Sequence, residues 1–160
     1  FDFIDRSIAV SLEREVFPRL IERGLTAFRF EGWWSDAGTL PNYLNAQHLL
    51  LAAGHGKIAP DADVTSGTLQ TPVAIGAGSF VEGRLGPDVV LGRSCKVGRA
   101  VVRNTALLDG VSIDDKAEVL GSIIGAGVAV GESAQVRDSI LQDGVQVPPH
   151  AEIVDDRVAA

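Results

Sequence analysis

The sequence predicts a mainly β protein: a parallel β-helix of about six coils, preceded by an α/β segment. From residue 58 onward, aliphatic residues recur with hexapeptide spacing and with a longer period of 17. The first 54 residues instead show the spacing of three or four residues that is typical of helices. Aromatic residues follow the same boundary, because only Phe80 of the nine lies beyond Tyr43. We therefore expect two parts, residues 1–54 and 55–160.

The period of 17 is clearest in the last coils, where four sets of three positions are apolar throughout. These sets are Val111, Val128 and Val145; Ile113, Val130 and Val147; Ala117, Ala134 and Ala151; and Val119, Val136 and Ile153. The same frame continues upstream, so that coils start near residues 58, 75, 91, 107, 124 and 141. A fixed period of this kind indicates a solenoid. Each hexapeptide supplies a short strand and a turn, and three of them form one triangular coil stacked about 4.8 Å from the next.

Two features of the repeat are compatible with a chemical role as well as a structural one. The pairs Gly76/Gly78 and Gly125/Gly127 are compatible with phosphate loops, but no helix follows them and the repeat already accounts for them. Cys95 occupies an inward repeat position, which favours a core thiol over a nucleophile.

Residues 1–54 are expected to form helices with a strand between them. Ser11 is a good N-cap for a first helix, Gly24 is placed to end it, and Pro18 predicts a kink or a restart. Residues 26–30 alternate weakly, which suits a short strand.

A second helix is expected from the N-cap Thr39 to Gly54, with Pro41 in its first turn. The apolar residues on one face of this helix are Tyr43, Ala46, Leu50 and Ala53. His55 and Gly56 are expected to form a linker.

Composition and charge exclude several classes of function. A net charge of −7 argues against nucleic-acid binding, which needs a basic face. No apolar run has the length that crosses a bilayer, and no signal peptide is visible, so no membrane partner is expected. One cysteine allows no internal disulfide, which favours a reducing, cytoplasmic setting.

The chemically informative segment is Gly32-Trp33-Trp34-Ser35-Asp36-Ala37-Gly38-Thr39. It lies between a predicted strand and a predicted helix, where α/β enzymes commonly place functional groups. The Asp36 carboxylate is a candidate ligand for a divalent metal. On the residues alone, a turn residue is an equally good interpretation of Asp36.

This segment resembles part of a known family. Residues 11–20 (SLEREVFPRL), Gly24, the segment 32–39 and Tyr43-Leu44 are similar to the closing section of the nucleotidyltransferase domain of NDP-sugar pyrophosphorylases. The mannose-1-phosphate guanylyltransferase and glucose-1-phosphate nucleotidyltransferase group fits best, since many members append a hexapeptide-repeat β-helix.

The resemblance implies a left-handed β-helix that follows the end of a Rossmann-like nucleotidyltransferase domain. It also implies that Asp36 helps to bind a catalytic Mg²⁺ and that Trp34, Gly38 and Thr39 contact substrate. One departure is visible: the family usually has Pro directly after Gly-Thr, whereas here Leu40 precedes Pro41.

The implied reaction is attack of a sugar-1-phosphate on the α-phosphate of an NTP, which yields an NDP-sugar and pyrophosphate. The resemblance also implies a Gly-rich NTP loop, and nothing like that loop occurs in these residues. Because the chain begins at Phe1 within an apparently continuing fold, we expect a fragment that is inactive alone and whose parent is an enzyme. The open end of the last coil is expected to be covered by another subunit or by a further tail, and a homo-oligomer is expected.

Two alternatives remain open at this point. A hexapeptide-repeat acyltransferase would use a histidine base, for which His55 and His150 are candidates, although a solvated surface histidine is the simpler interpretation of both. A regulatory or scaffold subunit would have kept the fold and lost catalysis.

Overall fold

The computed structural model describes residues 4, 7–32 and 34–159. The chain divides into two compact units, residues 1–34 and 35–160.

The first unit contains a short interrupted helix. Its segments are a π-helical turn η1 (Leu12–Val16), α1 (Phe17–Leu20) and a 3₁₀ turn η2 (Ile21–Arg23). The Ser11 hydroxyl accepts a hydrogen bond from the Arg14 N–H at 3.3 Å, and Gly24 ends the helix with φ 94°. Pro18 lies in the first turn of α1. The predicted cap, the restart near Pro18 and the glycine stop are confirmed.

The strand predicted over residues 26–30 is wrong. The structure describes these residues as extended chain without regular secondary structure. A strand is stabilised by hydrogen bonds to a neighbouring strand, and no described segment pairs with this one. Phe28 and Phe30 are consequently 90% and 57% exposed.

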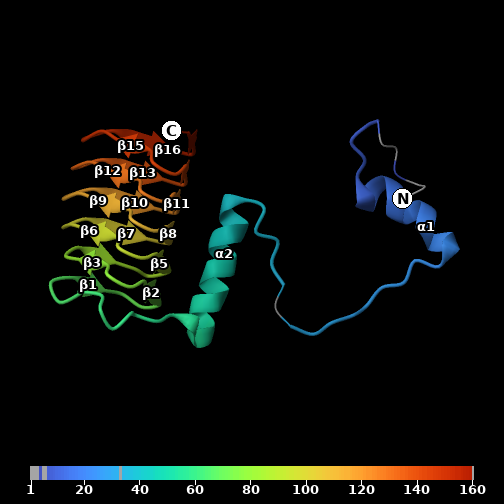
Figure 1. The fold of residues 1–160 in the computed structure, drawn as a ribbon, viewed down its shortest axis with the longest axis horizontal. Coiled ribbons are helices and arrows are strands. Elements are labelled where there is room, and N and C mark those ends of the chain that lie inside the picture. The colour runs from blue at the N-terminus through green and yellow to red at the C-terminus, as the bar shows by residue number, and fades with distance from the viewer. Residues whose placement is uncertain (1–3, 5–6, 33, 160) are drawn as a thin grey trace. The chain divides into compact units, whose positions relative to one another are not determined.

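The second unit is a parallel β-helix with three sheets in the part of the chain that is described (Figure 1). Sheet A contains β2 (Val73–Ile75), β5 (Val89–Leu91), β8 (Thr105–Leu107), β11 (Ile123–Ile124), β14 (Ile140–Leu141) and β17 (Arg157–Val158). Sheet B contains β3 (Phe80–Val81), β6 (Lys96–Val97), β9 (Ser112–Ile113), β12 (Ala129–Val130) and β15 (Gln146–Val147). Sheet C contains β1 (Thr68–Leu69), β4 (Arg84–Leu85), β7 (Val101–Arg103), β10 (Glu118–Leu120), β13 (Gln135–Arg137) and β16 (Glu152–Val154).

The strand register confirms the predicted repeat frame. One row of paired residues runs through all coils: Ile58, Ile75, Leu91, Leu107, Ile124, Leu141 and Val158. Of the twelve positions that repeat every 17 residues, ten are buried, and Ala151 and Ile153 of the last coil are partly buried. The aliphatic rows therefore form one continuous core along the axis of the β-helix.

Aspartates above glycines stabilise the corners. The Asp143 Oδ1 accepts the Ala126 N–H at 2.7 Å, one coil below, and a Cβ on Gly125 would lie 2.6 Å from that oxygen. In the same way, the Asp109 Oδ1 accepts the Arg93 N–H, and a Cβ on Gly92 would clash with that oxygen. The glycines of the repeat thus make room for a capping carboxylate, which supports their structural interpretation.

Cys95 is fully buried in the core, as expected. Its Sγ lies 3.1 Å from the Leu108 carbonyl oxygen, and burial raises the pKa of the thiol. A buried thiol with a raised pKa is a poor nucleophile.

Hydroxyl side chains form a buried ladder at another corner. Thr105, Ser122 and Ser139 are each 0% exposed. The Ser122 hydroxyl donates to the Leu120 carbonyl oxygen at 2.7 Å and accepts the Ser139 N–H at 3.1 Å. Ser139 repeats this one coil on, accepting the Asp156 N–H at 3.1 Å. Each hydroxyl thus links its own coil to the next.

Replacing Ser122 by alanine is expected to lower the free energy of unfolding by about 1–2 kcal/mol, because the Ser139 N–H loses its acceptor inside the protein. Urea unfolding measures the loss. Ser112→Ala, on the half-exposed outer face of sheet B, is the matched control. Equal effects of the two substitutions would contradict the ladder's role.

Helix α2 (Leu40–Leu50) continues into a π-helical turn η3 (Leu51–His55) and lies along the outer face of sheet A (Figure 1). Gly54, at φ 85°, closes this turn, as predicted. The helix buries Leu44, Gln47 and Leu51 rather than the predicted face, so that Tyr43 and Leu50 are 37% and 50% exposed. Gln47 belongs to the buried face because backbone carbonyls of the β-helix satisfy its amide.

Candidate functional site

The turn before α2 is the candidate site. The Asp36 Oδ1 accepts the Gly38 N–H at 3.1 Å, so that the side chain folds over the turn. A Cβ on residue 38 would lie 3.1 Å from this oxygen, which explains the glycine there. The Thr39 hydroxyl accepts the Asn42 N–H at 3.4 Å and caps α2. The structure therefore brings Asp36, Gly38 and Thr39 together in one turn.

The departure from the family pattern has a small structural effect. Leu40 is the first residue of α2, and Pro41 still lies in the first helical turn. Proline is tolerated there because its missing N–H would have no intrahelical partner. The inserted leucine therefore leaves the Asp36 turn and the Thr39 cap intact.

Trp34, a predicted substrate contact, belongs to the unit of residues 1–34 and is 74% exposed. Its neighbour Trp33 lies outside the described residues.

The described residues do not form a complete metal centre. Among them there is no group of three or more His, Cys, Asp or Glu side chains that would hold a metal ion. Asp36 is exposed, and its Oδ2 has no hydrogen-bond partner within the described part of the chain. This turn alone offers one carboxylate oxygen, which is fewer ligands than Mg²⁺ requires.

Two residues that sequence reasoning missed fasten α2 to the β-helix. The Gln47 amide donates to the carbonyl oxygens of Asp88 and Thr105 at 2.9 and 3.3 Å. The next residue, His48, places its Nδ1 2.8 Å from the Asp88 Oδ1. A buried glutamine next to a histidine in a helix is a weak sequence signal, because the carbonyls that it meets lie about 40 and 60 residues away.

A groove of about 760 Å³ lies beside this attachment. Its lining includes Thr39, Leu44, His48, Asp88, Asn104 and Asp138. The groove therefore opens next to the cap of α2, close in sequence to Asp36.

The comparisons with known proteins identify the β-helix. The family model of the GMPPB C-terminal domain, the C-terminal domain of mannose-1-phosphate guanylyltransferase beta, matches residues 58–159. The chain belongs to this family. No curated protein matches the chain.

The GMPPB C-terminal domain match covers the β-helix and begins after the Asp36 turn. The turn is separated from the matched domain by α2 and η3. Gln47 and His48 of α2 connect this helix to the domain by hydrogen bonds.

The histidines considered for acyl transfer are exposed in this member of the GMPPB C-terminal domain family. His55 ends η3, and His150 lies at a corner of the last coil with φ 63°. Neither belongs to a group of three potential metal ligands among the described residues. No described helix is long and apolar enough to cross a membrane.

Ion pairs cross between coils on the outer side of sheet B. Arg99 binds Asp115 through its side chain and its N–H, and the hydrogen bond and charge hold the pKa of the Asp115 carboxyl below its ordinary value of 3.8. Lys116 Nζ lies 2.6 Å from the Glu132 Oε1 and lowers the pKa of Glu132 in the same way.

These pairs predict a direction for acid sensitivity. Because both carboxyl pKa values are lower in the folded than in the unfolded chain, the pairs stabilise the fold above pH about 4. That stabilisation is lost as the pH falls through the folded values. Arg99→Gln is expected to raise the Asp115 pKa toward 3.8, as measured by carboxyl ¹³C NMR titration. An unchanged Asp115 pKa in Arg99→Gln, or a raised Asp115 pKa in the control Arg84→Gln, would refute the Arg99 side chain as the cause of the lowered pKa.

Proposed function

We propose that this protein is part of a sugar-1-phosphate nucleotidyltransferase of the GDP-mannose pyrophosphorylase type. The observation that carries the proposal is the GMPPB C-terminal domain match over residues 58–159, which follows the Asp36-Gly38-Thr39 turn after one helix, α2 with η3. In the reaction, an oxygen of the sugar-1-phosphate forms a bond to the α-phosphorus of GTP. The bond between that phosphorus and the bridging oxygen to the β-phosphate breaks, and pyrophosphate leaves.

Within this proposal, Asp36 supplies one carboxylate ligand to Mg²⁺ in the intact enzyme. The remaining ligands come from outside the described residues, because those residues hold no complete site. Mg²⁺ would neutralise charge that develops on the phosphates. Trp34, Gly38 and Thr39 are proposed to contact the substrates; the Thr39 hydroxyl also caps α2.

The attachment of α2 gives the Asp36 turn a fixed support. Gln47 and His48 hold the helix against two coils of the β-helix, and Thr39 caps the same helix. Reactions of this kind depend on positioning and on charge neutralisation more than on acid–base groups. The β-helix is therefore proposed to position the final segment of the catalytic domain in a cytoplasmic enzyme.

The test is pyrophosphate release by the intact protein. Mannose-1-phosphate with GTP and Mg²⁺ is expected to give pyrophosphate and GDP-mannose, detected by a coupled phosphate assay and by mass spectrometry. The 160-residue chain alone is expected to give none. Absence of product from the intact protein with any NTP and hexose-1-phosphate would refute the proposed function, and turnover by the isolated chain would refute the fragment's predicted inactivity.

A further inference from the structure

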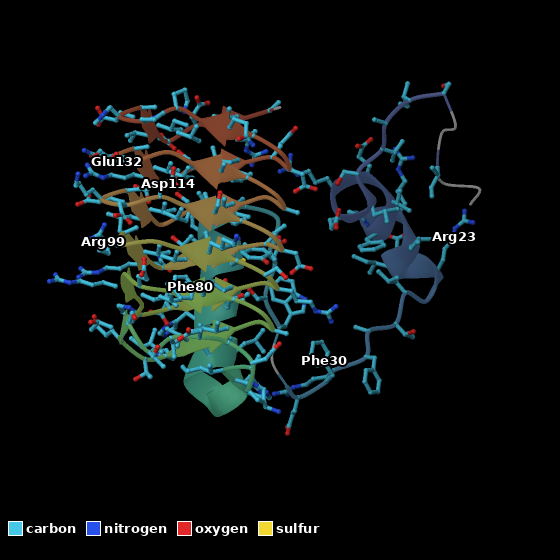
Figure 2. All side chains as sticks on the ribbon, turned by 60° about the vertical axis from the view of Figure 1, so that its left-hand side comes forward. Arg23, Phe30, Phe80, Arg99, Asp114 and Glu132 are labelled. Atoms are coloured by element: carbon cyan, nitrogen blue, oxygen red, sulfur yellow. The ribbon has the colours of Figure 1, made fainter. Side chains whose placement is uncertain are left out.

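Within residues 35–159, no segment lies on the outer face of sheet B, whereas α2 lies on that of sheet A (Figure 1). One outward-facing residue comes from each strand: Phe80, Lys96, Ser112, Ala129 and Gln146. A shallow hollow of about 740 Å³ lies on this face. Figure 2 shows Phe80, Arg99, Asp114 and Glu132 on the same side of the β-helix. Phe80 is the only aromatic residue of the β-helix, and it is 37% exposed.

The charges around this hollow differ in sign from one coil to the next. On the coil of β6, the lining holds the cations Lys96 and Arg99. On the coil of β9, it holds the carboxylates Asp114 and Asp115 together with Lys116. The border between the two coils crosses the hollow.

Not all of these charges are paired within the chain. Arg99 pairs with Asp115, and Lys116 pairs with Glu132. Among the described residues, Lys96 and Asp114 take part in no ion pair or side-chain hydrogen bond, although both are exposed and both line the hollow. Within the lining of the hollow, one unpaired cation therefore lies on the coil of β6, and one unpaired carboxylate on the coil of β9.

We propose that a second copy of this chain docks antiparallel on the outer face of sheet B. A two-fold axis in the plane of the face, parallel to the strands and midway between β6 and β9, sets the coil of β6 against the coil of β9 of the second copy. Such a contact is self-complementary, so every interaction occurs twice.

The register determines the contacts of this arrangement. Lys96 faces the row that holds Ser112 and Asp114 of the second copy, and its long side chain forms an ion pair with Asp114 there. Phe80, one coil below β6, packs on Ala129 of the second copy, one coil above β9. Small residues in the middle of the face, Gly98 and Ser112, let the two backbones approach. Opposite charges meet across the interface, which sets its register.

Charge-swap variants of the 160-residue chain test the proposal by sedimentation velocity at about 0.15 M salt. The wild-type chain is expected to dimerise. Lys96→Glu places two pairs of negative charges in the interface, and Asp114→Lys places two pairs of positive charges there. Each variant alone is expected to dimerise at least ~10-fold more weakly. An equimolar mixture of the two is expected to recover the wild-type affinity. In a dimer of one copy of each variant, one ion pair reforms with reversed sign and the other is the wild-type Lys96–Asp114 pair.

Matched controls reverse charges on the outer face of sheet C. Arg84→Glu and Glu152→Lys are expected to leave the dimer unchanged, and thermal unfolding verifies that every variant is folded. A monomeric wild type at about 100 µM would overturn the proposal. So would variants that dimerise as tightly as the wild type, or a mixture that fails to recover. None of these outcomes depends on nucleotidyl transfer.

Discussion

Asp36→Asn is expected to lower the turnover of the intact enzyme at least ~100-fold. Asparagine keeps the oxygen that accepts the Gly38 N–H, so the turn before α2 is preserved. The substitution removes the negative charge with which Asp36 is proposed to bind Mg²⁺. Even mutation of a residue that only supports the metal ligands typically lowers activity or metal affinity 10- to 100-fold. If Asp36 is only a turn residue, this substitution should leave turnover unchanged. If Asp36 is a metal ligand, turnover should fall.

The measurements are the rate of pyrophosphate release at increasing Mg²⁺ concentration and the thermal unfolding of the same protein. A metal ligand predicts a raised Mg²⁺ requirement with unchanged unfolding. Asp61→Asn, at an exposed position of the β-helix, is the control and should keep full activity. Wild-type turnover by Asp36→Asn would contradict the metal-ligand role and leave Asp36 with a role in the turn alone.

Gly83→Ala is expected to lower the free energy of unfolding by about 3 kcal/mol. A Cβ at position 83 would lie 2.3 Å from the Ala100 carbonyl oxygen, 2.5 Å from that of Gly98 and 2.6 Å from the Ala100 N. All three atoms belong to the backbone of the coil above. Relief would require the two coils to move apart, which would strain the hydrogen bond from the Arg84 N–H to the Ala100 carbonyl oxygen.

Gly144→Ala is the matched control. Gly144 has φ 76°, but nothing lies within 4 Å of its potential Cβ, so only the backbone conformation is penalised, by about 1 kcal/mol. Urea unfolding of both variants separates steric contact between coils from backbone strain. A loss at Gly83 no greater than that at Gly144 would show that the coils adapt to the added methyl group.

The candidate site was only partly predictable. The caps and turns near Asp36 depend on neighbours within a few residues, so the roles of Gly38 and Thr39 in the turn follow from local chemistry. The binding role of Asp36 stays a prediction, because the described residues supply a single carboxylate at this turn.

The β-helix and its frame were predictable from the repeat pattern alone. Inward positions recur at a fixed interval, so Leu107, Ile124 and Leu141 had to fall in one row once the coil length was known. The inward place of Cys95 followed from the same frame.

Long-range contacts determine which face of α2 is buried and whether residues 26–30 pair as a strand. Gln47 is buried because two carbonyls remote in sequence accept its amide hydrogen bonds, whereas the apolar Tyr43 remains partly exposed. Residues 26–30 alternate like a strand but find no partner among the described residues. In both places the outcome depends on contacts between distant segments, and a local pattern of hydrophobicity carries no information about which distant groups will meet.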